Sequence, residues 1–164
     1  MAFSKQKISP CLWFDTEAEE AAKFYISVFP NSRINQVSRY TEAGRDVHGK
    51  AAGSVLTVEF ELDGQTFTAL NGGPQFKFTE AVSFQIVCED EIDRYWSRLC
   101  DGGKENVCGW LKDRYGLSWQ VVPSELAHML TDADRSRADR VLTAVMKMKK
   151  FDVAALKRAY AGVE

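Results

Sequence analysis

The most constraining stretch of the sequence is the run VLTVEFEL at residues 55–62, in which apolar and polar side chains alternate strictly. Successive side chains on a β-strand point to opposite faces of the sheet, so the run predicts a strand with one buried and one polar face. Asp63-Gly64 follows, and Thr66 to Leu70 returns as a partner strand, which is the pattern of a tight hairpin. The chain is therefore expected to build a sheet that buries one face against helices.

The strand and helix signals around this hairpin follow an order that is repeated in the second half of the chain. In the first half, an apolar run at 8–14 precedes a capping box at 16–19, which is expected to begin a helix that Pro30 ends. A further strand is expected near 33–40, before a Gly-rich loop that leads to the hairpin. This half is predicted to be a strand, a helix and three antiparallel strands.

The second half begins again with an alternating strand at 82–88. Apolar residues at helical spacing follow over 92–99, and the helix is expected to stop at Gly102-Gly103. A second hairpin is predicted from 107–112 and 117–122. A unit of this kind has an unpaired sheet edge and an uncovered sheet face, which favours the pairing of two units.

The predicted organisation is α+β, with a first βαβββ module at 1–74, a second at 75–123 and a helical tail at 124–164, together forming one domain. Asp152 is placed to cap a short final helix. An earlier helix of the tail is expected to bury one apolar stripe, formed by Ala138, Val141, Leu142, Val145 and Met146.

The composition limits the kinds of partner that we expect this chain to bind. The 21 basic and 23 acidic residues give a formal charge of -2 without long runs of either sign, so no electrostatic footprint for nucleic acid is present. The N-terminus lacks the apolar core of a signal peptide, and no stretch approaches the ~20 apolar residues of a membrane span. We expect a cytoplasmic protein with no membrane or nucleic-acid partner.

Four cysteines, at 11, 88, 100 and 108, lack C-x-x-C spacing and lie in or near apolar segments. In a reducing compartment this pattern is typical of free thiols that pack as small hydrophobes. A metal or redox role is the less favoured alternative, and Cys108, before Gly109 and Trp110, is the position where it would matter most.

The alternation also predicts a candidate binding face. If the apolar sides of the strands pack on the helices, the opposite side of the joined sheet carries Thr68, Gln85 and Gln120. We expect this face to line a concave, moderately polar cup for a small ligand, with Trp110 and Trp13 as apolar wall. The alternative is a solvent-facing sheet with ordinary polar residues, but such a face normally carries more charge.

Four segments of the chain are distinctive: LWFDTEAEEAAKFY, LNGGPQFKFTEAVSFQI, CGWLKDRYGLSWQVVP and KMKKFDVAALKRAYAG. Together they resemble the PhnB-like family that is often labelled 3-demethylubiquinone-9 3-methyltransferase. That family belongs to the vicinal oxygen chelate superfamily, with glyoxalase I, bleomycin-resistance proteins and extradiol dioxygenases. The resemblance covers nearly the whole chain and implies a glyoxalase-like fold, in which paired βαβββ modules curl a mixed sheet around a cup, in a homodimer.

Enzymes of that superfamily hold a divalent metal in the cup with His, Glu or Gln from the first and last strands of each module. Carried over by resemblance, those positions fall near Pro10 or Cys11, on Thr68 or Ala69, between Val82 and Gln85, and on Gln120. Only Gln120 and Gln85 could coordinate, and neutral amides are weak ligands. We therefore expect no metal.

The methyltransferase label is not supported by a motif of its own. No G-x-G-x-x-G turn of the kind that holds a nucleotide-like cofactor occurs in the sequence. We expect no cofactor, and no catalytic residue is identified.

The favoured function is a metal-free protein that binds a small molecule. One alternative is an enzyme of the same fold that acts on a small metabolite, with a metal or cofactor recruited by Glu59, His48 or the partner subunit. Another is an assembly module whose cup is filled by its own side chains.

Overall fold

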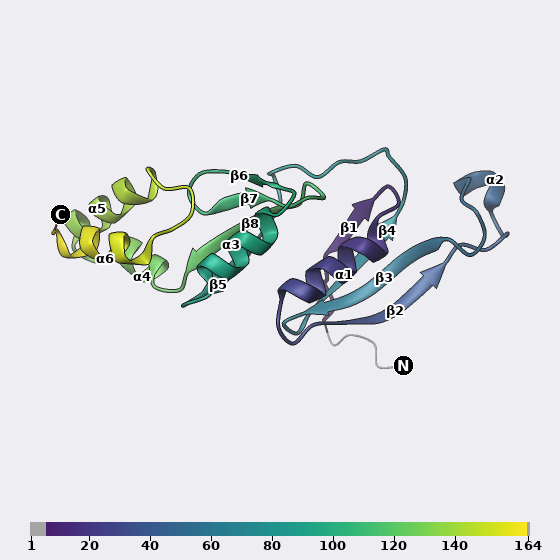
Figure 1. The fold of residues 1–164 in the computed structure, drawn as a ribbon, viewed down its shortest axis with the longest axis horizontal. Helices are drawn as coiled ribbons and strands as arrows, with labels where there is room; N and C mark the ends of the chain where they lie inside the picture. The colour runs from purple at the N-terminus through teal and green to yellow at the C-terminus, as the bar shows by residue number, and fades with distance from the viewer. Residues whose placement is uncertain (1–5, 164) are drawn as a thin grey trace. The chain divides into compact units, whose positions relative to one another are not determined.

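The computed structural model describes residues 6–163. The chain divides into two compact units, Met1–Lys77 and Phe78–Glu164, each with one four-stranded mixed sheet and a helix packed on it (Figure 1). The expected α+β class, with repeated strand and helix order, is confirmed. None of the helices between residues 6 and 163 has the length and apolar character needed to cross a bilayer.

The first unit contains six elements: β1 Cys11–Phe14, α1 Ala18–Val28, β2 Arg33–Arg39, α2 Arg45–His48, β3 Val55–Leu62 and β4 Gln65–Asn71. The strand order is β1-β4-β3-β2, with β1 parallel to β4 and the other pairs antiparallel. Asp63 and Gly64 both have positive φ, 46° and 81°, which is the conformation of a type I′ hairpin turn. The predicted hairpin is thus confirmed.

Helix α1 packs on β3 and β4 and covers one face of this sheet (Figure 1). Tyr25 of the helix is fully buried and stacks on Phe60, with ring centroids 6.2 Å apart. The alternation of β3 places Val58 and Leu62 on the same buried face. The other face carries the polar residues of the strands, and we call it the polar face of the unit.

The predicted capping box at the start of α1 is wrong. The cap residue is Glu17, and its side chain makes no capping hydrogen bond to the helix. Instead the amide of Ala18 donates to Oδ1 of Asn71, 2.8 Å away, from the end of β4. Asn71 is buried and also donates to the carbonyl of Val55, 3.1 Å away. A tertiary contact therefore replaces the local cap that the Thr16 pattern favoured.

The second unit contains eight elements: β5 Ser83–Cys88, α3 Ile92–Cys100, β6 Lys104–Glu105, β7 Trp110–Lys112, β8 Ser118–Pro123, α4 Leu126–Leu130, α5 Arg135–Val145 and α6 Val153–Ala161. The strand order β5-β8-β7-β6 repeats that of the first unit, with β5 parallel to β8. Helix α3 packs on β7 and β8, and we call the opposite sheet face the polar face of this unit.

A buried carboxylate shapes the β7–β8 hairpin. Asp113 is buried and accepts hydrogen bonds from the amides of Tyr115 and Leu117 and from the indole Nε1 of Trp119, at 2.9, 3.1 and 2.9 Å. Buried charges persist when several donors satisfy them. These hydrogen bonds stabilise the connection between the two strands. They thereby help to set the register of β7 with β8.

The C-terminal helices form a small core of their own, made by Leu126, Met129, Val141, Val145, Phe151 and Leu156. Asp152 caps α6 by accepting from the amide of Ala155 at 2.9 Å, as predicted. The expected apolar stripe of α5 is only partly correct. Leu142 and Met146 remain 43% and 63% exposed, because α5 meets α4 and α6 along a narrower face.

A tight turn before β7 joins these helices to the sheet. Cys108 and Gly109 both have positive φ, 56° and 78°, and their amides donate to the carbonyls of Met148 and Lys149 at 2.8 and 2.7 Å. A Cβ atom on Gly109 would lie 2.3 Å from the ring of Phe151. Glycine is therefore needed here both for the backbone conformation and for the close approach of the tail.

This arrangement predicts that Gly109→Ala weakens the docking of the tail. The matched control is Gly116→Ala, where φ is also positive, 84°, but no atom lies within 4 Å of a Cβ. Gly116→Ala should lower the free energy of unfolding by only the left-handed backbone cost of about 1–2 kcal/mol. Gly109→Ala should cost clearly more in urea unfolding and should raise amide hydrogen exchange in α5 and α6. Equal effects of the two substitutions would contradict tail docking at this turn.

Candidate functional site

Three of the five predicted ligand-binding residues lie side by side on the polar face of the second unit. In the parallel pair of β5 with β8, Gln85 is the register partner of Gln120. On the other side of β8, Gln120 is the partner of Trp110 in β7. We call these three residues the amide row. Strand register alone brings them together, although 35 positions separate the two glutamines in the sequence.

The amide row is linked by hydrogen bonds. Gln85 Nε2 donates to Gln120 Oε1 at 3.3 Å, and Gln120 Nε2 donates to Ser83 Oγ at 2.9 Å. Gln85 Oε1 accepts no hydrogen bond from residues 6–163. The half-buried indole of Trp110 lies in register beside them. The row thus offers amide donors and acceptors next to a flat apolar surface, which suits a polar small molecule.

The next register row on the same face was not selected from the sequence. Lys104 of β6 pairs with Lys112 of β7, Lys112 with Ser118 of β8, and Ser118 with Ser83 of β5. We call these four residues the lysine–serine row. Alternation along β5 and β8 puts Ser83 and Ser118 on the same face as the glutamines, and a step of two from Trp110 along β7 leads to Lys112. That step was the available signal.

The remaining two predicted residues belong to the first unit. Thr68 of β4 lies on the polar face, between Cys11 and Glu59 in register. Trp13 lies on the same face, in register with Leu70. Its indole Nε1 donates to the carbonyl of Gly73 at 2.8 Å. Its ring also meets Phe76 edge-on at 4.8 Å, so it packs against the chain that leaves β4.

Glu59 and His48, the two residues considered for recruiting a metal or cofactor, each make hydrogen-bond contacts within the first unit. Glu59 accepts from Asn35 Nδ2 at 3.4 Å. His48 ends the short helix α2, where its Nδ1 accepts from the amide of Lys50 at 3.0 Å and its Nε2 lies 3.2 Å from the carbonyl of Ala43. These contacts explain His48 as a residue that stabilises its own loop.

The residues at the positions implied for a metal do not fit a divalent cation. In the first unit they are a thiol and a hydroxyl, Cys11 and Thr68, and burial raises the pKa of the Cys11 thiol. In the second unit they are the two neutral amides of Gln85 and Gln120. Catalytic divalent sites use about three imidazole, carboxylate or thiolate donors. Among residues 6–163, no three His, Cys, Asp or Glu side chains form a group suited to hold a metal.

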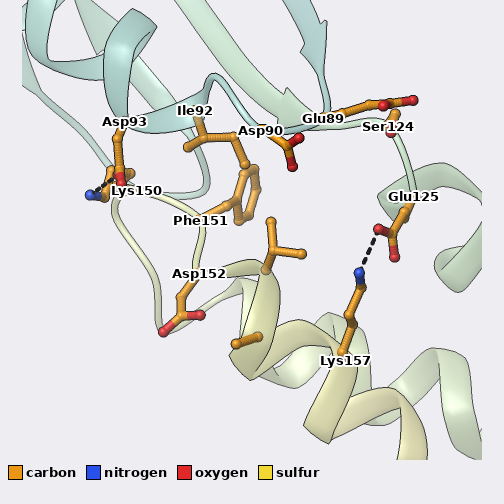
Figure 2. A pocket seen from close by; sticks show the side chains of 12 residues that line it. Glu89, Asp90, Ile92, Asp93, Ser124, Glu125, Lys150, Phe151, Asp152 and Lys157 are labelled. Atoms are coloured by element: carbon orange, nitrogen blue, oxygen red, sulfur yellow. Dashed lines mark hydrogen bonds and ion pairs between the residues drawn. The ribbon is translucent and has the colours of Figure 1, made fainter.

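A separate groove of about 720 Å³ lies where α6 meets the segments that follow β5 and β8 (Figure 2). Two ion pairs line it: Lys150 with Asp93, and Lys157 with Glu125 at 2.8 Å. Figure 2 shows the ring of Phe151 in the middle of the groove, close to Ile92. The remaining lining residues are Glu89, Asp90, Ser124, Asp152, Val153 and Ala154.

The groove differs in character from the usual small-molecule site. Its charged side chains already neutralise each other in part, and Asp152 is used as the cap of α6. Small-molecule sites are mostly apolar, with a few convergent polar groups. The polar face of the second unit, with its indole and linked amides, has the better chemistry for selective binding and is the candidate site.

All four cysteines are free, as expected. Cys100 lies at the end of α3, where burial and the nearby charge of Glu105 raise the pKa of its thiol to about 11. Burial also raises the pKa of the Cys88 thiol. These two thiols are therefore held in the protonated form, which is a poor nucleophile.

We predict that Cys100 in the folded protein reacts with iodoacetamide about 100-fold more slowly at pH 8 than in the urea-unfolded chain, because its thiolate fraction is that much lower. The folded-state pKa is above the ordinary thiol pKa of 9.0. The folded state therefore holds the Cys100 proton more tightly than the unfolded chain does. The stability that this preference contributes is complete below pH 9 and is lost as pH rises through about 11. Mass spectrometry of labelled peptides from pH 7 to 11 measures the labelling rate, and urea unfolding over the same pH range measures the change in stability. Equal labelling in the folded and unfolded states at pH 8 would contradict them.

Residues 6–122 match the family model described as 3-demethylubiquinone-9 3-methyltransferase. The match therefore includes the candidate site and ends before the C-terminal helices. No curated protein matches the chain.

Several solved structures are similar. One is the PhnB protein of Bacillus cereus, which is described as a 3-demethylubiquinone-9 3-methyltransferase. It is 36% identical, with a TM-score of 0.64, and the matched region covers 72% of this chain and 99% of the PhnB chain. A protein from Pseudomonas aeruginosa is 16% identical, with a TM-score of 0.57 and coverage of 73% and 98%. The fosfomycin resistance protein FosX from Mesorhizobium loti is 14% identical, with a TM-score of 0.51 and coverage of 72% and 90%. The last two share the fold alone.

Proposed function

The chain belongs to the 3-demethylubiquinone-9 3-methyltransferase (PhnB-like) family of the vicinal oxygen chelate superfamily, and from this premise we propose that it binds a small molecule without a metal. The observation that carries the proposal is the hydrogen-bonded pair of Gln85 and Gln120 beside Trp110 on one sheet face. In this proposal Gln120 and Gln85 bind polar groups of the ligand, and Trp110 packs against its apolar part.

The first unit contributes by analogy, because its strands have the same order and pairing. Thr68 would offer a hydroxyl to the ligand, and Trp13 would supply apolar surface. The contact of the Trp13 indole with Gly73 supports a rigid position for this ring. A rigid aromatic side chain gives contact area at a low cost in conformational entropy.

Neither a metal nor S-adenosylmethionine is part of the proposal. The donors at the positions implied for a metal are the amides of Gln85 and Gln120, the hydroxyl of Thr68 and the protonated thiol of Cys11, which bind divalent cations weakly. The sequence also lacks a glycine-rich turn of the kind that holds nucleotide-like cofactors.

We further propose a cytoplasmic homodimer. Strand β5 pairs with β8 only, so its other edge is unpaired among the described residues. Val82, just before this strand, and Val87 within it are exposed, at 65% and 64%. An unpaired edge beside exposed apolar side chains favours association with another strand.

Gln120→Ala tests the proposed site. The probes are benzamide and benzyl alcohol, which carry a hydrogen-bonding group on an aromatic ring, and binding is followed by side-chain amide and indole resonances in NMR. Gln120→Ala should weaken benzamide binding by about 1–3 kcal/mol, because a polar partner is left unpaired, while the urea midpoint changes little. The control is Gln36→Ala, at an exposed glutamine of β2 in the other unit. Unchanged affinity in Gln120→Ala would remove this residue from the site.

A second candidate is an enzyme that acts on a small metabolite, which the family description itself favours. Native mass spectrometry of freshly purified protein separates the two. A metal-free dimer, with or without a retained small molecule, is the expected result. One divalent ion per chain that survives dialysis would favour the enzyme and contradict the proposed role of the glutamines.

A further inference from the structure

We propose that the lysine–serine row binds the anionic, oxygen-rich headgroup of the ligand, a phosphoryl or carboxylate group. This inference rests on the proposed function, since the row lies on the same polar face as the amide row and one residue pair along the strands from it. It adds the chemical class of the ligand, which the amides alone do not determine.

Register places the four side chains in one line across all four strands of the sheet. Lys104, Lys112, Ser118 and Ser83 are successive partners on β6, β7, β8 and β5. Partners in register share a face, so two ammonium groups and two hydroxyls point to the same side. Ammonium and hydroxyl groups are the side chains that donate hydrogen bonds to oxyanions.

The two lysines are an unfavourable pair unless an anion is present. Like charges directly opposite each other on neighbouring strands destabilise a sheet. Gly103, the residue before Lys104, lets β6 lie close to β7. A Cβ on it would lie 2.1 Å from the carbonyl of Lys112, so only glycine fits at this position. The backbone thus brings Lys104 against Lys112 at a position that calls for a negative charge between them.

Glu80 supplies that charge in the unliganded protein. Its carboxylate lies 2.7 Å from the Lys112 ammonium, with the two side chains 56% and 33% exposed. The hydrogen bond from Lys112 lowers the pKa of this carboxyl, and the charges of Lys112 and Lys104 lower it further. Glu80 belongs to the connection between β4 and β5. An ion pair this exposed is weak, so a ligand oxyanion can displace it.

Ser118 gives independent support. Its side chain is fully buried, and its hydroxyl has no hydrogen-bond partner among the described residues. The next residue of β8, Trp119, is on the face that α3 covers, so Ser118 faces the row, between Lys112 and Ser83. A buried hydroxyl without a partner is rare and destabilising. A ligand oxygen held at Lys112 would give it one.

The two rows together describe the ligand. Its anionic head would lie on the lysine–serine row, and the adjoining part would meet the amides of Gln85 and Gln120 and the indole of Trp110. A matched ion pair of the same unit provides the controls, because Lys157 and Glu125 are 2.8 Å apart in the groove of Figure 2. The pair of Lys112 and Glu80 has a similar length, 2.7 Å, and all four side chains are between 33% and 56% exposed.

The test uses the full-length protein and four probes that share one aromatic ring: phenylphosphonate, benzoate, benzyl alcohol and benzylamine. Dissociation constants are measured by calorimetry, and the site is followed by the glutamine amide resonances. Phenylphosphonate should bind most tightly and benzylamine least. Lys112→Met should weaken phenylphosphonate about tenfold and leave benzyl alcohol unchanged, because a charge-assisted hydrogen bond is lost. Lys157→Met should change neither.

Glu80→Gln should change the phenylphosphonate affinity in the opposite direction from Lys112→Met, an effect that a damaged fold could not produce. Removing the competing carboxylate should tighten phenylphosphonate several-fold, whereas Glu125→Gln should have no effect. Ser118→Ala should weaken phenylphosphonate while the urea midpoint stays the same or rises, because an unpaired buried hydroxyl is removed. Unchanged phenylphosphonate affinity in Glu80→Gln and Lys112→Met would overturn the inference.

The outcomes also separate this inference from the proposed function. Equal binding of phenylphosphonate and benzyl alcohol, with both weakened by Gln120→Ala, would leave the binding face in place and reject the anionic headgroup. No shift of the glutamine resonances with any of the four probes would reject the proposed function itself. Phenylphosphonate binding that depends on Lys157 would place the anion in the groove and reject the lysine–serine row.

Discussion

The parallel pairing of β5 with β8 is the constraint on which the candidate site depends. These strands are the first and last of the unit, and their register sets Gln85 beside Gln120 and Ser83 beside Ser118. A shift of β8 by one residue would turn Gln120 and Ser118 toward α3 and bring Trp119 to the polar face. The buried carboxylate of Asp113 then fixes β7 against β8, so Trp110 and Lys112 join the two rows.

The first unit repeats this pairing with different chemistry. Its β1 and β4 are also parallel neighbours at the sheet edge, but the side chains in register are Cys11 and Thr68. The carboxylates on its polar face are drawn toward β2, where Glu61 pairs with Arg33 at 2.7 Å. One scaffold therefore carries an acidic face tied to its own edge strand and, in the second unit, a face with two lysines. The repeat explains the fold, and the proposed specificity rests on the differences between the repeats.

Local patterns in the sequence predicted the parts of the structure that are decided locally. Alternation predicted β3 and β8, and Asp63-Gly64 predicted the hairpin, because side-chain direction and positive φ depend on neighbouring residues only. The cap of α1 was missed because Asn71, 53 residues away, supplies it. The lysine–serine row was missed because β6 is only two residues long and has no periodicity to read. Its partner Lys112 becomes meaningful only once the register is known.

The C-terminal helices, which lie beyond the matched region, stabilise this site through a short contact. Met148 and Lys149 accept hydrogen bonds from Cys108 and Gly109, the two residues immediately before Trp110. The carbonyl of Gly109 in turn accepts from the amide of Val121, next to Gln120, at 2.9 Å. A turn with two left-handed residues is strained when one of them is not glycine, and such strain persists only where surrounding contacts hold it. The tail supplies those contacts through Met148 and Lys149, between α5 and α6, and so supports the turn that leads into Trp110.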